Sequence, residues 1–296
     1  MTPAPNDSSI RPRLSVLFAA DAPKAVILRR GPKTHWHLVL WDLATDTFTP
    51  GQWMKGLVRL CDLSPAGDKL IYWAAQYHAS ANWRGQQSAG IRTGGVYEPL
   101  RTRAPITFRP GRRVPRYLQA HAGPRRGLAQ RITGTWTAIS TPPYFSALAI
   151  WPAFGHWTGG GVFLSPRDVR IYEPLDRMVP IERVRLPPAV RVRSYLAPTL
   201  SHVAATRRSA STPSRGTSIH VDLDDAALAR HGVTWVEFAH TLSETDMVFA
   251  CDGRVYRLTG WRDVPADRTF DEAKLLVDLS ADKFTLLEAP PEAMRW

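Results

Sequence analysis

Residues 40–49 read Leu-Trp-Asp-Leu-Ala-Thr-Asp-Thr-Phe-Thr, and residues 276–285 read Leu-Val-Asp-Leu-Ser-Ala-Asp-Lys-Phe-Thr. Six of the ten positions are identical in the two segments. In each copy an apolar run meets Asp, Ala, Ser or Thr, a composition that favours a turn, and then resumes at Phe-Thr. The pattern predicts a strand, an acidic turn and a return strand at both places. The repetition indicates an architecture built from similar hairpins.

Apolar runs of strand length, separated by turn residues, continue outward from the first copy. They predict strands at residues 14–20, 25–30, 36–43, 48–53, 57–63 and 69–75. Further hairpins are predicted around the Ser-Pro turn of residues 165–168 and the Asp-Gly turn of residues 251–256. One short helix is expected over Asp224–Arg230, ended by Gly232.

Two of these segments resemble the blades of WD-repeat and Tol-type β-propellers. Leu40-Trp41-Asp42 is similar to their Leu-Trp-Asp strand, and Ser64–Asp68 with the strand after it is similar to their Ser-Pro-Asp-Gly turn. The resemblance implies an all-β fold, a diverged β-propeller of about four to five blades with long insertions. Related hairpins near both ends would close such a ring by packing the first and last blades together. A β-sandwich is the alternative, because it is also built from short strands separated by turns.

The chain length and the hydrophobic fraction favour one folded domain. The chain has 296 residues, of which 44% are hydrophobic, so residues 11–296 are expected to form a single domain with a disordered stretch at 1–10 and a mobile loop at 201–218. Neither a signal peptide nor a membrane-spanning run is visible. Cys61 and Cys251 have no CxxC spacing and are predicted to be core thiols. A cytoplasmic location is therefore expected.

The positive charge is concentrated in one third of the chain. The net charge is +12; residues 69–167 hold 13 Lys or Arg and one acid, whereas the remainder holds 25 basic and 25 acidic residues. We predict an Arg-rich insertion at 78–135 that binds a partner. Its candidate binding residues are Arg101, Arg103, Arg109, Arg112, Arg113, Arg116, Arg125, Arg126 and Arg131.

Three interpretations of this insertion are open. Arginine binds carboxylates and phosphates in bidentate fashion, so the partner would be a protein with an acidic surface. Arginines interleaved with aromatic residues could instead hold single-stranded nucleic acid. The third interpretation is a solvated basic loop that reflects the Arg-rich composition of a GC-rich genome.

A second candidate site is an aromatic region followed by three glycines. Its residues are Trp136, Tyr144, Trp151, His156, Trp157 and Gly160. They could line a pocket, because glycines let the backbone approach a ligand closely. Alternating aromatic residues on strands also fill the core between sheets, which is the competing interpretation. A propeller-based hydrolase or lyase acting on an anionic substrate is the enzymatic alternative, for which the sequence assigns no catalytic residue.

No cofactor and no metal are expected. His35 and His37 have a spacing that could chelate a transition metal, but no third ligand accompanies them. His220 with Asp222, Asp224 and Asp225 could act as an acid–base group, yet Asp before a short helix is ordinary capping. The sequence thus predicts a non-catalytic module that binds a protein partner and has no contact with a membrane.

Overall fold

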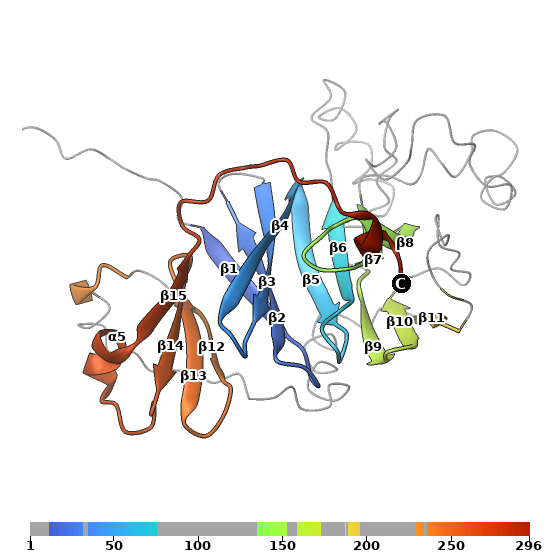
Figure 1. Cartoon of the computed structure of the whole chain (residues 1–296). Coiled ribbons are helices and arrows are strands. Elements are labelled where there is room, and N and C mark those ends of the chain that lie inside the picture. The colour runs from blue at the N-terminus through green and yellow to red at the C-terminus, as the bar shows by residue number, and fades with distance from the viewer. Residues whose placement is uncertain are drawn as a thin grey trace, which may run out of the picture.

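The protein is all-β, as the sequence predicts. The computed structural model describes residues 12–31, 35–75, 135–152, 159–172, 187, 189–195, 229–233 and 236–296. Fifteen strands in these ranges form four sheets, here named A to D (Figure 1). Sheet A contains β1 (Arg13–Phe18), β2 (Lys24–Arg30), β3 (His35–Asp42) and β4 (Thr47–Lys55). Sheet B contains β5 (Leu57–Leu63), β6 (Leu70–Ala75), β7 (Thr135–Ser140) and β8 (Ala147–Pro152).

The other two sheets come from the second half of the chain. Sheet C contains β9 (Gly161–Ser165), β10 (Asp168–Tyr172) and β11 (Arg191–Tyr195). Sheet D contains β12 (Val236–Thr241), β13 (Asp246–Cys251), β14 (Arg254–Thr259) and β15 (Lys274–Asp278). In every sheet the strands lie in chain order, and all pairings are antiparallel except that of β10 with β11. Three short helical turns lie entirely within the described ranges: η4 (Ala266–Arg268), α5 (Thr269–Glu272) and η5 (Pro291–Met294).

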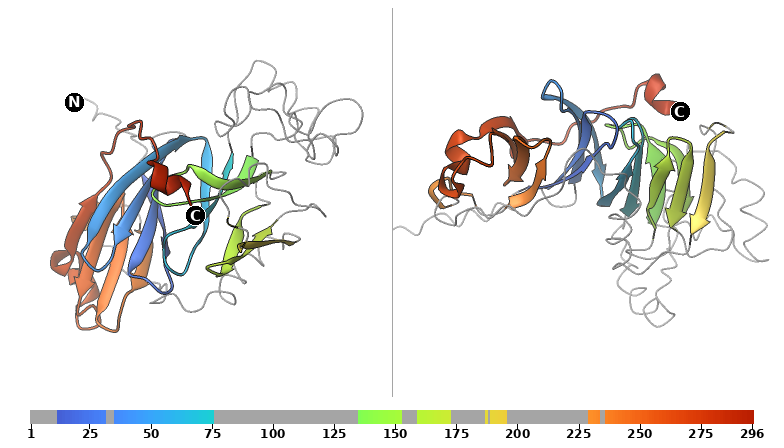
Figure 2. Two further views of the ribbon diagram at one scale, coloured as in Figure 1. Left: turned by 45° about the vertical axis from the view of Figure 1, so that its right-hand side comes forward. Right: turned by 90° about the horizontal axis from the view of Figure 1, so that it is seen from below.

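The sheets stand side by side in the order D, A, B, C, which Figure 2 shows from below. The last sheet of the chain therefore lies beside the first. The first strands of neighbouring sheets are in contact: β1 touches both β12 and β5, and β5 touches β9. Sheet D thus packs on sheet A.

Apolar layers fill the spaces between the sheets. Strand β2 contributes side chains to two of these layers, because Ala25 and Ile27 face sheet D whereas Val26 and Leu28 face sheet B. A strand buried on both faces reads as a continuous apolar run. The third layer, between sheets B and C, is formed by residues such as Ile139 from β7 and Val169 from β10.

The face of sheet D that points away from sheet A is covered by the chain itself. Phe270 of α5 packs edge-on against Phe249 and Tyr256 of the sheet. Sheet D is therefore covered on both faces. Sheets C and D share no core cluster among the described residues, so the four sheets form an open row.

The six strands predicted within residues 14–75 and the two predicted hairpins around residues 165–168 and 251–256 are confirmed, with strand ends shifted by one or two residues. The Asp252–Gly253 turn has φ of 50° and 82°, values typical of a two-residue hairpin turn. The helix predicted over Asp224–Arg230 is described only at its end, where Gly232 follows with φ 62°. Residues 1–10, the insertion up to Gly134 and the loop at 201–218 lie outside the described residues.

One prediction about the repeat is wrong. The first copy forms the hairpin of β3 and β4, but the second copy has only its first strand, β15. After Asp278 the chain turns and then leaves sheet D instead of pairing back on it. The reason is a set of tertiary contacts, because side chains of sheet A bind the segment that follows β15.

Candidate functional site: a strap held across sheet A

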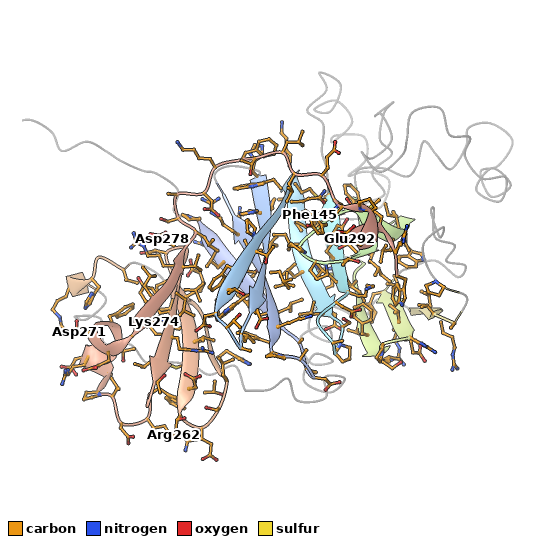
Figure 3. The ribbon with its side chains drawn as sticks, in the orientation of Figure 1. Phe145, Arg262, Asp271, Lys274, Asp278 and Glu292 are labelled. Atoms are coloured by element: carbon orange, nitrogen blue, oxygen red, sulfur yellow. The ribbon has the colours of Figure 1, made fainter. Side chains whose placement is uncertain are left out.

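Residues 279–296, named here the strap, connect three sheets. The strap leaves β15, crosses the edge of sheet A and ends in η5 beside sheet B (Figure 1). In Figure 3 the labelled residues Asp278 and Glu292 mark the two ends of this crossing. Much of the strap is exposed and it forms no strand, so its position depends on a small number of side-chain contacts.

Arg29 of β2 holds the beginning of the strap. Its Nη2 donates to the carbonyl oxygen of Ser280 at 2.9 Å, its Nε donates to the carbonyl of Leu279, and its Nη1 donates to the carbonyl of Gly31. The Arg29 residue is only 2% exposed. Burial lowers the pKa of this guanidinium, and the charge of Asp282 opposes that effect. A buried cation is tolerated here because carbonyl oxygens satisfy its donors.

His37 and Trp53 extend this contact across the sheet. Arg29 pairs with His37 in the β2–β3 register, and His37 pairs with Trp53 in the β3–β4 register. The His37 ring stacks on Trp53 at 4.3 Å, and the Arg29 guanidinium lies 5.5 Å from the Trp53 ring centre. His37 Nδ1 lies 3.1 Å from Asp282 Oδ2. Arg29, His37 and Trp53 are named here the seat. Arg29 binds main-chain carbonyls of the strap, His37 contacts one carboxylate, and the Trp53 ring packs against both side chains.

Gln52 of β4 joins the strap to the neighbouring sheet. Its Nε2 donates to the carbonyl of Leu287 at 3.0 Å, while its Oε1 accepts the amide hydrogens of Phe145 at 2.7 Å and Ser146 at 3.1 Å. The main-chain amide of Gln52 donates to the carbonyl oxygen of Pro143 at 3.0 Å. One side chain therefore links sheet A, the β7–β8 turn and the strap.

The end of the strap is anchored on sheet B. Trp296 packs against the apolar layer between sheets B and C, and Lys69 Nζ lies 5.5 Å from its ring centre. Ala293 in η5 is buried. Because both ends of the strap are held, the residues between them have a defined position.

Three of these residues form an apolar ridge on the surface. Phe284, Leu286 and Leu287 are 55%, 85% and 40% exposed. The Phe284 ring is supported by His35 at 5.5 Å and Trp53 at 6.1 Å. Only two other large hydrophobic side chains of the described residues are comparably exposed, Leu164 and Leu275. Clusters of exposed apolar side chains mark protein contacts more often than isolated ones do.

The second Asp of each repeat copy makes a contact between sheets A and D or the strap. In the second copy, Asp282 contacts His37 of sheet A. In the first copy, Asp46 lies 2.6 Å from Arg257 of sheet D and also accepts a hydrogen bond from Trp41 Nε1 at 3.3 Å. Each copy therefore contributes an Asp to the junction between sheets A and D.

The structure separates two members of the predicted pocket. Trp136 points into the layer between sheets A and B, whereas Trp151 points into the layer between sheets B and C. Tyr144 lies in the β7–β8 turn, and Gly160 packs so closely that an added Cβ would lie 2.7 Å from Cys61 Sγ. The remaining members, His156 and Trp157, lie outside the described ranges.

The other predicted residues have the following positions. His37 is buried against Asp282, His35 lies beside Phe284, and no group of three or more metal-ligating side chains occurs in the described part of the chain. Cys251 is buried and burial raises the pKa of its thiol, whereas Cys61 is partly exposed. The arginines predicted to bind a partner and the His220–Asp225 group fall in ranges that are not described.

The strap and its seat were not predicted. Asp282 belongs to the repeated acidic turn, but its partner His37 is 245 residues away in the sequence. Among the described helices, none is both long and apolar enough to cross a membrane. No protein family, curated protein or solved structure matches the chain.

Proposed function

We propose that the protein is a non-catalytic binding module of the cytoplasm, which recognises an acidic surface on a protein partner through the Arg-rich insertion. Its four sheets would act as blades of a propeller-like scaffold. The blade interpretation is supported by the chain order of strands within each sheet and by the contacts between first strands of neighbouring sheets. In this arrangement rigid sheets position a recognition segment.

The observation that carries the proposal is the place where the insertion joins the fold. Strand β6 ends at Ala75 and β7 begins at Thr135, and these two residues are direct partners in the register of sheet B. Both strands are internal, because β5 and β8 flank them. The insertion is thus attached at two adjacent points of a buried sheet, and attachment at both ends reduces the entropy lost on binding.

The charge of the insertion supports an acidic partner. Residues 69–167 carry the whole net charge of +12. A concentrated positive field accelerates association with an acidic surface and makes it sensitive to salt. The apolar ridge of the strap offers a second contact that would be independent of charge.

Replacement of Arg112, Arg113, Arg125 and Arg126 by Gln tests the proposal. We expect this variant to lose capture of protein partners from native lysate, and its thermal midpoint to stay within about 2 °C of the parent, as is usual for surface substitutions. The matched control replaces four exposed arginines of the described ranges by Gln, namely Arg191, Arg262, Arg268 and Arg295. It removes the same charge and should keep capture.

Two outcomes would contradict the proposal. Equal capture by both variants would remove the insertion from recognition. Elution of nucleic acid in place of protein, with affinity for a single-stranded oligonucleotide that falls steeply as salt rises, would replace the acidic protein with a polynucleotide.

A further inference from the structure

Glu237 of β12 lies in the seam between sheets D and A. Its Oε1 accepts the amide hydrogen of Gly253 at 3.1 Å. Its Oε2 is sealed from solvent and has no hydrogen-bond partner of normal geometry, although the amides of Leu14 and of Glu237 itself weakly favour the charged form. An ionised carboxylate oxygen in such a position has no water to solvate its negative charge, and this disfavours ionisation.

The groups around Glu237 add repulsion. Asp252, in the β13–β14 turn, is buried and its charge acts against that of Glu237. The other ionisable groups on the adjoining strands are Arg13 on β1, Asp246 and Cys251 on β13, Arg254, Tyr256 and Arg257 on β14, and Lys274 and Asp278 on β15. Arg254 and Asp278 are joined at 2.8 Å. His240 lies further along β12 itself, stacked on Phe18 at 3.9 Å.

The β13–β14 turn, which binds Glu237 through Gly253, also contacts the start of β1 and the strap. The carbonyl of Gly253 accepts the amide hydrogen of Leu279 at 3.0 Å, at the start of the strap. A Cβ added to Gly253 would lie 2.7 Å from Cγ of Pro12 and 3.4 Å from Cα of Ser280. The turn is therefore in close contact with the beginning of β1 and with the strap. A change in the charge of Glu237 acts on all three segments.

We propose that Glu237 is a proton-operated latch of the seam between the first and last sheets. With its proton bound, the carboxyl group is neutral, the repulsion from Asp252 is absent and the seam is closed. Loss of the proton to water leaves a buried carboxylate beside Asp252 and loosens the contact of the β13–β14 turn with β1 and the strap. The device is independent of the proposed partner.

The pH range follows from the burial of the group. Burial, with a smaller contribution from Asp252, raises the pKa of Glu237 to about 7. The folded state then binds the Glu237 proton more tightly than the unfolded state does. This group's contribution to stability is complete below the ordinary range of a Glu carboxyl and decreases as pH rises toward about 7. Each unit of pKa difference corresponds to about a tenfold change in the folding equilibrium constant.

The test compares the full chain with Glu237→Gln and with Glu244→Gln, a control at an exposed position of the β12–β13 loop. The thermal midpoint is measured between pH 6 and 8, together with hydrogen exchange of the Leu279 amide, corrected for intrinsic base catalysis. We expect the parent and the control to lose about 2–4 °C over this range and the Leu279 amide to exchange roughly tenfold faster at pH 8. Glu237→Gln should be flat in both measurements.

A second variant keeps the test decisive if Glu237→Gln does not fold. Asp252→Asn removes the repelling charge and therefore lowers the pKa of Glu237, so we expect the pH-dependent change in both measurements to occur at a lower pH than in the parent. A parent without pH dependence between 6 and 8, or a Glu237→Gln protein that retains the parent's dependence, would overturn the latch.

Discussion

Asp46 and Arg257 join the first sheet of the chain to the last, with Oδ2 of Asp46 2.6 Å from Nη1 of Arg257. Both side chains are about one-fifth exposed, and Arg257 also lies 3.5 Å from Asp246 and donates to the carbonyl of Leu43. An ion pair that is this well shielded is screened less by water than a surface pair.

Removal of Arg257 tests this junction. Arg257→Met leaves Asp46 and Asp246 without their shared cation, and we expect a loss of about 1–3 kcal/mol in the free energy of unfolding. Urea unfolding of Arg257→Met, Asp46→Asn and the double variant gives the coupling energy of the pair. Strictly additive effects would show that the contact contributes nothing beyond its separate parts.

Arg29 is predicted to be essential for holding the strap. Arg29→Met leaves the buried carbonyls of Leu279, Ser280 and Gly31 without their donor, and we expect a loss of about 3 kcal/mol or more. Limited proteolysis should then cut the strap in the native protein. The neighbouring Arg30→Met is the control, because Arg30 is exposed on the same strand, and it should leave the cleavage pattern unchanged.

Gln52 is predicted to stabilise the fold although its side chain is only partly buried. Gln52→Ala removes the acceptor of two amides and the donor to Leu287, so we expect a loss of about 1–3 kcal/mol in urea unfolding. Gln52→Glu retains an acceptor for the amides of Phe145 and Ser146 and loses only the donor. It should therefore fall between the parent and Gln52→Ala; a Glu variant less stable than the Ala variant would contradict this assignment.

The two thiols should differ in reactivity. Burial raises the pKa of Cys251, whereas Cys61 is partly exposed. Iodoacetamide at pH 8 should modify Cys61 in the folded protein, and Cys251 only when the chain unfolds. Mass spectrometry of the alkylated peptides with and without urea measures both rates. Equal rates in the folded protein would show that the β13 strand opens locally.

The apolar ridge should matter for binding and not for folding. Leu286→Ser changes a side chain that is 85% exposed, and surface substitutions usually change stability by less than about 0.5 kcal/mol. We expect weaker capture of protein partners at high salt, where the contribution of charge is screened. Unchanged capture at every salt concentration would assign recognition to the insertion alone.

Local signals were sufficient to predict the four strands of sheet A and the first two strands of sheet B. Turn residues between apolar runs located β1 to β6, because these strands obtain their length and their ends from neighbouring residues. The continuous apolar run of β2 also carried the information that both of its faces are buried.

The second repeat copy shows where local signals fail. Residues 276–285 share six of ten positions with residues 40–49, yet only the first copy forms a hairpin. Arg29 and His37 capture the second copy at Leu279, Ser280 and Asp282, and these contacts span about 245 to 251 residues of sequence. For the same reason His37 could be noticed as a candidate ligand but its carboxylate partner could not be predicted.

The packing of sheet D on sheet A has a consequence for biosynthesis. Ile27, Val39 and Trp41 face a layer that is completed only by residues near the end of the chain. At a ribosomal rate of about 5–20 residues per second, roughly 10–50 s separate the emergence of sheet A from that of sheet D. During this interval the nascent chain presents an uncovered apolar face, so it is a natural client for chaperones that shield such faces until translation ends.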